Sequence, residues 1–165
     1  MVEQIASNYG LLLAITGAMI SVFCAGVGSC LGISLAAHAA DGLLSEDPER
    51  FGSLLILVAL PGTQGIYGFL GAFLIVNKLG FLGGTPVTTL AIHHGWEILC
   101  AALPVGLGGL VSAIYQGKVC AAGVVMTAKQ PDAAMKGVIF AAMVETYAIL
   151  GLLATILLLQ GIRLN

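Results

Sequence analysis

Charged residues are scarce in this sequence, and their scarcity excludes most soluble proteins. Asp, Glu, Lys and Arg make up 8% of the 165 residues, whereas hydrophobic residues make up 59% and the mean hydropathy is +1.05. A soluble domain carries roughly 25% charged residues. The net charge of −2 also lacks the positive excess that binds nucleic acid. The composition therefore predicts an integral membrane protein in the lipid bilayer, with no nucleic-acid partner.

The motifs of a catalytic centre are missing as well. The sequence contains no glycine-rich phosphate-binding loop and no nucleophile–base pair, so we do not expect an enzyme by itself. Its four cysteines lie in apolar segments without CxxC spacing, and we interpret them as small packing residues. His93, His94 and Glu97 could form a surface metal site, although the interpretation that we favour is a polar loop at the membrane surface.

Long apolar runs take the place of those motifs. No charged residue occurs between Gln4 and Ala40 or between Phe51 and Asn77, and only Glu145 interrupts the last run. A transmembrane helix needs about 20 apolar residues. The sequence therefore predicts an all-α membrane protein with four transmembrane helices, at 10–44, 51–77, 96–129 and 133–161. They form two tandem helical hairpins, 1–80 and 96–165, joined by a connecting segment at 81–95.

The basic residues give a small bias to the orientation of these hairpins. The two short turns contain Arg50, Lys129 and Lys136, against Lys78 and Arg163 on the opposite side. Cytoplasmic segments carry the excess of Lys and Arg in membrane proteins. We therefore expect the short turns to lie in the cytoplasm.

The sequence contains an internal duplication, in which the fourth helix and the turn before it are copies of the second helix and its turn. A shift of 83 residues, called the repeat shift below, takes Pro48 onto Pro131 (131 − 48 = 83). The same shift matches the second helix with the fourth. The first and third helices share Gly and Ala at four-residue steps, which allow close backbone contact in lipid, but this pattern leaves their register open. A compact four-helix monomer and a curved ring of hairpins both fit. The copies differ where Glu145 aligns with Gly62, so that one carboxylate serves four helices.

Glu145 is the candidate functional residue, because it lies near the middle of the fourth helix. A charged side chain at that depth costs roughly 2.5–3.5 kcal/mol, so the carboxylate needs a proton, a cation or hydrogen-bond donors. A protonated Glu145 in a simple interhelical hydrogen bond is one interpretation. Ion or proton handling is favoured, because the neighbours are polar too. Counting back from the turn at Gln130 and Pro131 places Gln116 level with Glu145.

The second helix supplies further oxygen atoms. Thr63 and Tyr67 share one face, with Gln64 beside them. Pro61 has no N–H, so it should kink the helix and free nearby carbonyls, including that of Leu60. Carboxylate, amide, hydroxyl and carbonyl oxygens suit a hard cation, and a single carboxylate suits a monovalent one. The pattern thus favours Na⁺ as the bound ion, and H⁺, which needs only the carboxylate and one acceptor, remains the alternative.

Three segments carry a resemblance to a known family: Leu60–Phe69, Tyr115–Val119 and Ile139–Gly151. Together they resemble the duplicated c-type proteolipids of V-type ATPases, called subunit K in the bacterial enzymes. The resemblance covers nearly the whole chain, and the main departure is the connection at 83–97. It implies a homo-oligomeric rotor ring in a bacterial cell membrane. ATP hydrolysis in other subunits would turn this ring through a central-stalk subunit against a membrane stator subunit.

The resemblance also implies roles for the residues of the site. In sodium-pumping members the ion is held by residues that match Glu145, Gln116, Gln64, Thr63 and the carbonyl of Leu60. A tyrosine that matches Tyr67 donates a hydrogen bond to the glutamate and helps to close the site.

Two other functions fit the sequence. A stand-alone carrier would use Glu145 as its proton-coupling group. A structural, pore-forming proteolipid would assemble and work normally with Glu145→Gln.

Overall fold

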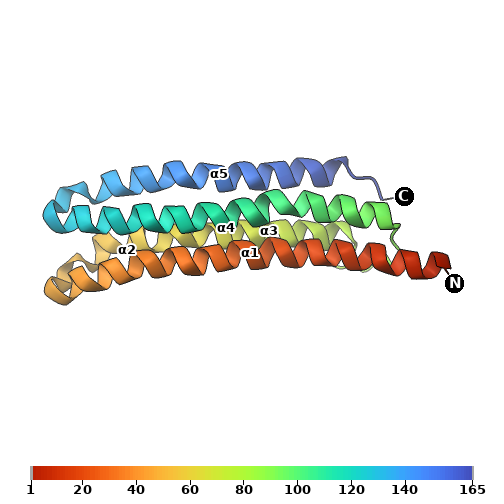
Figure 1. Cartoon of the computed structure of the whole chain (residues 1–165), viewed down its shortest axis with the longest axis horizontal. Helices are drawn as coiled ribbons and strands as arrows, with labels where there is room; N and C mark the ends of the chain where they lie inside the picture. Colours follow the sequence, from red (N-terminus) through yellow and green to blue (C-terminus); the bar gives the residue numbers. More distant parts are fainter. Residues whose placement is uncertain (1, 165) are drawn as a thin grey trace.

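Helices account for every regular element in the part of the chain that the structure describes. This computed structural model describes the backbone of residues 2–164 and the side chains of residues 9–164. The helices are α1 (Val2–Glu46), α2 (Phe51–Ala59), α3 (Thr63–Lys78), α4 (Ile92–Lys129) and α5 (Ala134–Gly161), with short 3₁₀ turns at Pro48–Arg50, Leu60–Gly62 and Pro131–Ala133 (Figure 1). A bilayer offers the backbone no hydrogen-bond partner, and a helix satisfies its polar groups internally.

Within the described part of the chain, four segments are long and apolar enough to cross a membrane, which confirms the expected number of spans. They are Tyr9–Glu46, Pro48–Lys78, Ile92–Lys129 and Pro131–Gly161. The third helix begins at Ile92, earlier than the expected start at residue 96. The ring Nδ1 of His94 lies 2.8 Å from Glu97 Oε2, one turn along the same helix. A pair at this spacing supports a helix rather than a polar loop.

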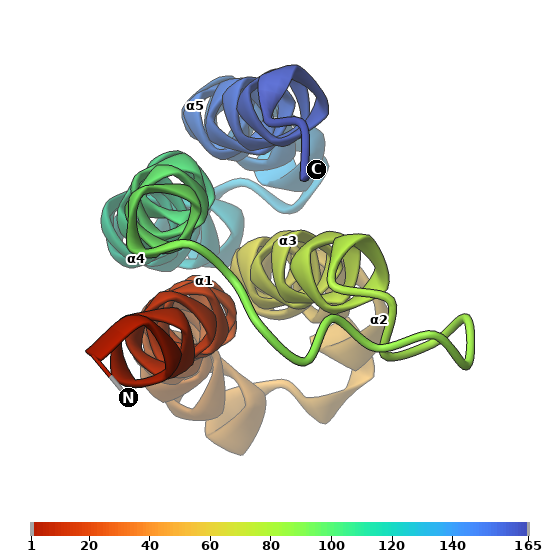
Figure 2. The same cartoon turned by 90° about the vertical axis from the view of Figure 1, so that its right-hand side faces the viewer.

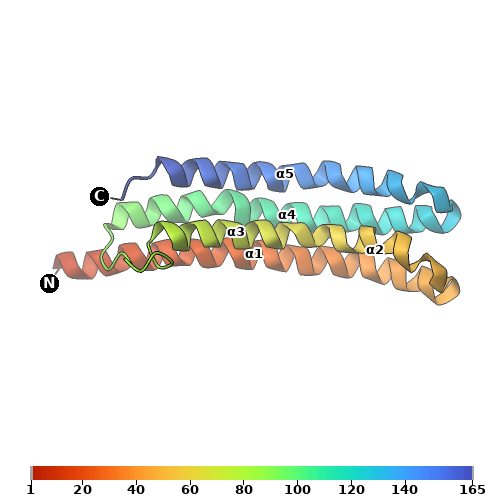
Figure 3. The same cartoon turned by 180° about the vertical axis from the view of Figure 1, so that it is seen from behind.

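The two hairpins run in the same sense. Both turns lie at one end of the molecule, and the two termini and the α3–α4 connection lie at the other (Figures 1 and 3). Arg50 joins the first turn to the end of α4, because its Nε donates to Asp47 Oδ2 (2.6 Å) and its Nη1 donates to the carbonyl of Thr127 (2.7 Å). At the other end the connection bends at Gly80 and Gly84, both with positive φ.

Glycine brings α1 and α4 into backbone contact. A Cβ at Gly28 would lie 2.6 Å from the Cα of Leu110, and a Cβ at Gly117 would meet the carbonyl of Gly32. Helices in lipid associate through such close packing, because burying apolar side chains gains little there. Viewed end-on, α1 and α4 lie side by side, α3 lies against both of them, and α5 lies against α4 (Figure 2).

The structure fixes the register that the sequence left open. A Cβ at Gly68 of α3 would lie 2.5 Å from the carbonyl of Ser21, and a Cβ at Gly151 of α5 would lie 2.6 Å from the carbonyl of Pro104. The repeat shift takes both partners of the first contact onto those of the second. It therefore relates α1 to α4 as well as α3 to α5.

Candidate ion-binding site

The candidate site begins where the second span is interrupted. Pro61 lies in a 3₁₀ turn, Leu60–Gly62, between α2 and α3, as its missing N–H predicts. The carbonyl of Leu60 accepts hydrogen bonds from the backbone N–H of Thr63 and from its hydroxyl, the latter at 3.0 Å. The break therefore places a backbone carbonyl and a hydroxyl next to each other in the middle of the span.

Glu145 of α5 is held by two donors from different helices. The hydroxyl of Tyr67 on α3 donates to Glu145 Oε1 at 2.7 Å. The side-chain amide of Gln116 on α4 lies 3.4 Å from Glu145 Oε2. Glu145 is the twelfth residue of the 28-residue helix Ala134–Gly161, so it is about 17 Å from one end and about 24 Å from the other. The carboxylate thus lies at the depth of the bilayer core and is half-buried.

The two glutamines connect this carboxylate to the helix break. Both are fully buried, at 0% exposure. Gln64 Nε2 donates to Gln116 Oε1 at 2.5 Å, and Gln116 Nε2 donates to the carbonyl of Ala141 at 3.0 Å. Thr63 Oγ1 lies 3.4 Å from Gln64 Oε1. All six residues singled out in the sequence therefore come together in one hydrogen-bonded chain of oxygen and amide groups.

Apolar packing encloses this polar layer from both ends of the bundle. One buried cluster lies toward the termini and includes Ile75 and Ile98. Another lies toward the turns and includes Leu57, Cys120 and Ala141. Hydrogen bonds and ion pairs inside such a low-dielectric layer are stronger than in water, and unpaired polar groups are costly. Among the described residues, no buried side-chain nitrogen or oxygen lacks a hydrogen-bond partner.

The chemistry of these groups suits a hard cation. Their possible ligands are all oxygens, and no group of three or more His, Cys, Asp or Glu that could hold a metal occurs in the described part of the chain. The ion pairs present in the described part of the chain are Arg50–Asp47 and His94–Glu97. Within that part, Glu145 therefore forms no ion pair with a basic side chain. A negative charge without a basic partner is a suitable place for a cation or a proton.

Serine side chains that the sequence analysis did not single out help to position the site. Ser112 Oγ on α4 donates to the carbonyl of Val144 at 2.9 Å, directly before Glu145. Ser29 Oγ on α1 accepts from the backbone N–H of Gly65 at 2.8 Å, directly after Gln64. The repeat shift takes Ser29 onto Ser112. This match within the repeat is the sequence feature from which the two serines could have been identified.

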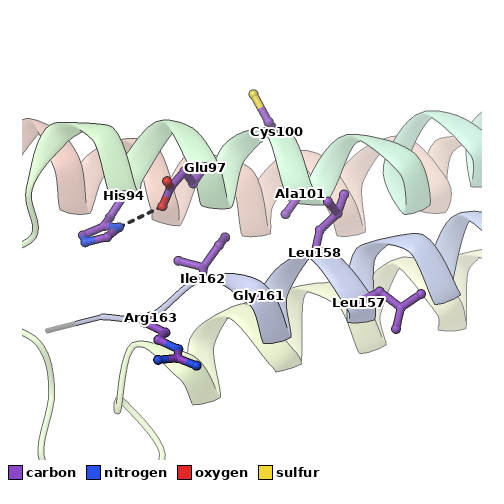
Figure 4. Close-up of a pocket in the computed structure, with 9 residues that line it drawn as sticks. All are labelled: His94, Glu97, Cys100, Ala101, Leu157, Leu158, Gly161, Ile162 and Arg163. Atoms are coloured by element: carbon purple, nitrogen blue, oxygen red, sulfur yellow. Dashed lines mark hydrogen bonds and ion pairs between the residues drawn. The ribbon is translucent and has the colours of Figure 1, made fainter.

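The polar residues at the start of α4 belong to a different place. His94 and Glu97 line a cavity of about 670 Å³ near the end of the bundle, together with Leu157, Leu158 and Arg163 (Figure 4). The ring of His93 stacks against that of His94, with centroids 4.0 Å apart. His94 and Glu97 pair with each other here, and both lie within α4 rather than in the polar loop that the sequence led us to expect.

Comparison with known proteins agrees with this architecture. The chain is 46% identical to the V-type sodium ATPase subunit K of Enterococcus hirae, over 93% of this chain and 94% of that protein. It is 40% identical to the A-type ATP synthase subunit K of Methanocaldococcus jannaschii, over 92% of this chain and 64% of that protein. It is 27% identical to the 16 kDa proteolipid of the human V-type proton ATPase, over 92% of this chain and 93% of that protein.

The family pattern of the ATP synthase C subunit matches the chain twice, at residues 16–75 and 99–158. The repeat shift takes the first match onto the second, end to end, so the two matches coincide with the two hairpins. On these grounds, this four-helix membrane protein belongs to the family of the ATP synthase C subunit.

Proposed function

We propose that this chain is the rotor-ring subunit of a V-type ATPase and that it carries Na⁺ at Glu145. The observation that carries the proposal is the hydrogen-bonded network that begins at the carbonyl of Leu60 and ends at Glu145 and Tyr67. This network lies in the apolar middle of the bundle. Members of this family form rings. In such a ring, each copy would present one carboxylate to the membrane.

The oxygen content of the site favours Na⁺ over H⁺. A proton needs only the carboxylate and one acceptor, whereas Na⁺ needs several oxygens around it. The carbonyl of Leu60, the hydroxyl of Thr63 and the amide oxygens of Gln64 and Gln116 lie within one hydrogen-bonded chain with Glu145. The similarity to a sodium ATPase subunit of Enterococcus hirae supports the same ion. Proton carriage is the alternative, and a proton ATPase proteolipid is among the more distant relatives.

The mechanism follows from charge neutrality. A bound Na⁺ cancels the charge of Glu145, so the loaded site can pass the lipid at small cost. Tyr67 holds one carboxylate oxygen, which leaves the other oxygen directed toward the amide of Gln116 and the ion. Release requires a competing cation, and a basic residue of the membrane stator subunit would supply it. Rotation then moves the ion between two access paths.

The hairpins have unequal roles in this scheme. The first hairpin, 1–80, supplies Thr63, Gln64 and Tyr67, whereas the second, 96–165, supplies Gln116 and Glu145. The segment at 81–95 joins them. ATP is hydrolysed elsewhere in the complex, so the chain is not an enzyme by itself. The end that carries the two short turns meets the central-stalk subunit and faces the cytoplasm of a bacterial cell.

Carbodiimide labelling of Glu145 tests the ion. The reagent modifies protonated carboxyls, so a bound Na⁺ protects the site. We expect Na⁺ to suppress labelling of the purified protein at constant pH, and to need a higher concentration as the pH falls and protons compete. Glu145→Gln should abolish the label, and Glu97→Gln, outside the bundle core, should retain it. Protection by rising pH alone, with no effect of Na⁺, would instead establish H⁺ as the ion.

A further inference from the structure

The repeat in this chain also describes how two copies of it meet. The repeat shift takes α1 onto α4 and α3 onto α5. Applied once more, it takes α4 onto a helix outside this chain, which is α1 of a second copy. Every contact between α1 and α4 then has a counterpart between α4 and the α1 of the next copy. The residues at the counterpart positions can be read from the sequence.

These counterpart positions on α4 carry larger side chains. The residues of α1 that bring its backbone against α4 are Gly10, Gly17, Gly28 and Gly32. The shift replaces them with His93, Cys100, Val111 and Tyr115. All four of these are exposed on the surface of α4 in the single chain. The face of α4 that a second copy would meet is therefore built from side chains rather than from glycine.

The reciprocal face of α1 shows the same change. The residues of α4 that meet the backbone of α1 include Gly95, Gly106 and Gly117. The reverse of the repeat shift takes them onto Leu12, Phe23 and Ser34. Phe23 is 70% exposed. It borders a surface cavity of about 590 Å³ that is lined by residues of α1 alone: Thr16, Met19, Ile20, Val22 and Phe23.

We propose that these two faces meet, so that α4 of one copy packs on α1 of the next with a wider helix spacing than the α1–α4 pair within a copy. The proposal rests on the ring of the proposed function and adds its subunit interface. Within a copy, a Cβ at Gly28 would come within 2.6 Å of the Cα of Leu110. Between copies, the same place holds the Cβ and both methyl groups of Val111. The side chains therefore hold the backbones apart and fill the space between them.

The row of α1 and α4 helices in such a ring is therefore uneven. Tight glycine pairs within each copy alternate with looser, side-chain-filled contacts between copies. The repeat shift predicts one specific contact. Gly28 and Leu110 touch within a copy; the forward shift takes Gly28 onto Val111, and the reverse shift takes Leu110 onto Val27. Val111 of one copy therefore faces Val27 of the next. Both are exposed in the single chain.

Cross-linking between cysteines tests the pairing. Cys24, Cys30, Cys100 and Cys120 are first replaced by alanine, and Val27→Cys and Val111→Cys are combined in one full-length chain. A short bifunctional maleimide added to membranes should then give a ladder of covalent multimers. Each single variant should give none. Val27→Cys with Val125→Cys is the matched control, because Val125 lies about 21 Å further along α4. Equal ladders from both pairs, or none from the first pair in an intact ring, would overturn the pairing while leaving the Na⁺ site untouched.

The spacing is tested separately by Val111→Ala. Val111 and Val125 are both 54% exposed on α4, but their counterparts on α1 differ. Gly28, the counterpart of Val111, packs against the backbone of α4, whereas Gly42, the counterpart of Val125, has open space around it. At the wider spacing, Val111→Ala leaves a cavity and lowers the temperature at which detergent-resistant multimers dissociate, whereas Val125→Ala leaves it unchanged. If neighbouring copies were as close as α1 and α4, Val111→Ala would relieve a clash and raise that temperature, which would overturn the proposed spacing.

Discussion

Removing one hydroxyl from the site should weaken Na⁺ binding by a measurable factor. The hydroxyl of Tyr67 donates to Glu145 Oε1 at 2.7 Å in a half-buried position. A hydrogen bond to a charged group contributes about 1.5–3 kcal/mol. Tyr67→Phe removes the donor and keeps the ring, so the carboxylate that faces Na⁺ is less well stabilised relative to its protonated form. The Na⁺ concentration that halves carbodiimide labelling should rise about 10- to 150-fold at constant pH.

The control is a tyrosine two residues from the carboxylate. The side chain of Tyr147 is 71% exposed, and no hydrogen bond of its hydroxyl is present among the described residues. Tyr147→Phe should therefore leave the half-protecting Na⁺ concentration unchanged. If Tyr67→Phe shifted that concentration no more than Tyr147→Phe does, the hydroxyl would have no part in holding the carboxylate, and the assignment of Tyr67 would fail.

Three further changes have expected outcomes. Gly32→Ala places a methyl group against the carbonyl of Ala113 and should lower the free energy of unfolding by about 1–3 kcal/mol or more. Gly42→Ala adds a methyl group in open space and should be neutral or stabilising. Thermal unfolding in detergent measures both. Gln116→Leu leaves the amide of Gln64 without its buried acceptor, and Na⁺ protection of Glu145 should be lost while the chain still inserts into membranes. Arg50→Ala removes a half-buried ion pair and a charge-assisted hydrogen bond to the carbonyl of Thr127. It should lower the free energy of unfolding by about 1.5–3 kcal/mol, and an unchanged stability would contradict a role for this tie.

Much of the fold follows from where charged residues are absent. The uncharged runs locate the spans, and Pro61 locates the break in the second one. The contacts of α1 with α4 could not be predicted in the same way. Small residues at four-residue steps permit several registers, because each offers a similar surface to a neighbour. The start of α4 at Ile92 was also missed, since His93, His94 and Glu97 are typical of a loop until the helical pair between them is seen.

The site was predictable where two simple rules applied. Hairpin symmetry about the turn placed Gln116 level with Glu145, and the bond of 3.4 Å between them agrees with this. The helix break brought Thr63 and Leu60 together. Neither rule predicts the direct bond from Gln64 to Gln116, because it joins helices from different hairpins. The roles of Ser29 and Ser112 were missed because serines within helices often bond to backbone groups without any functional meaning.

Among the described residues, the groups bonded to the Glu145 carboxylate come from two helices of its own chain, Tyr67 on α3 and Gln116 on α4, so each copy can hold its carboxylate by itself. A single copy in detergent should bind its ion as well as an assembled ring does. When wild-type and Glu145→Gln copies are mixed, each remaining carboxylate should keep its own affinity, because its two donors, Tyr67 and Gln116, belong to its own chain. Transport should nevertheless stop with few mutant copies, since every copy must pass the stator in turn. Binding would thus decline in proportion to the mutant fraction, and pumping would decline far more steeply.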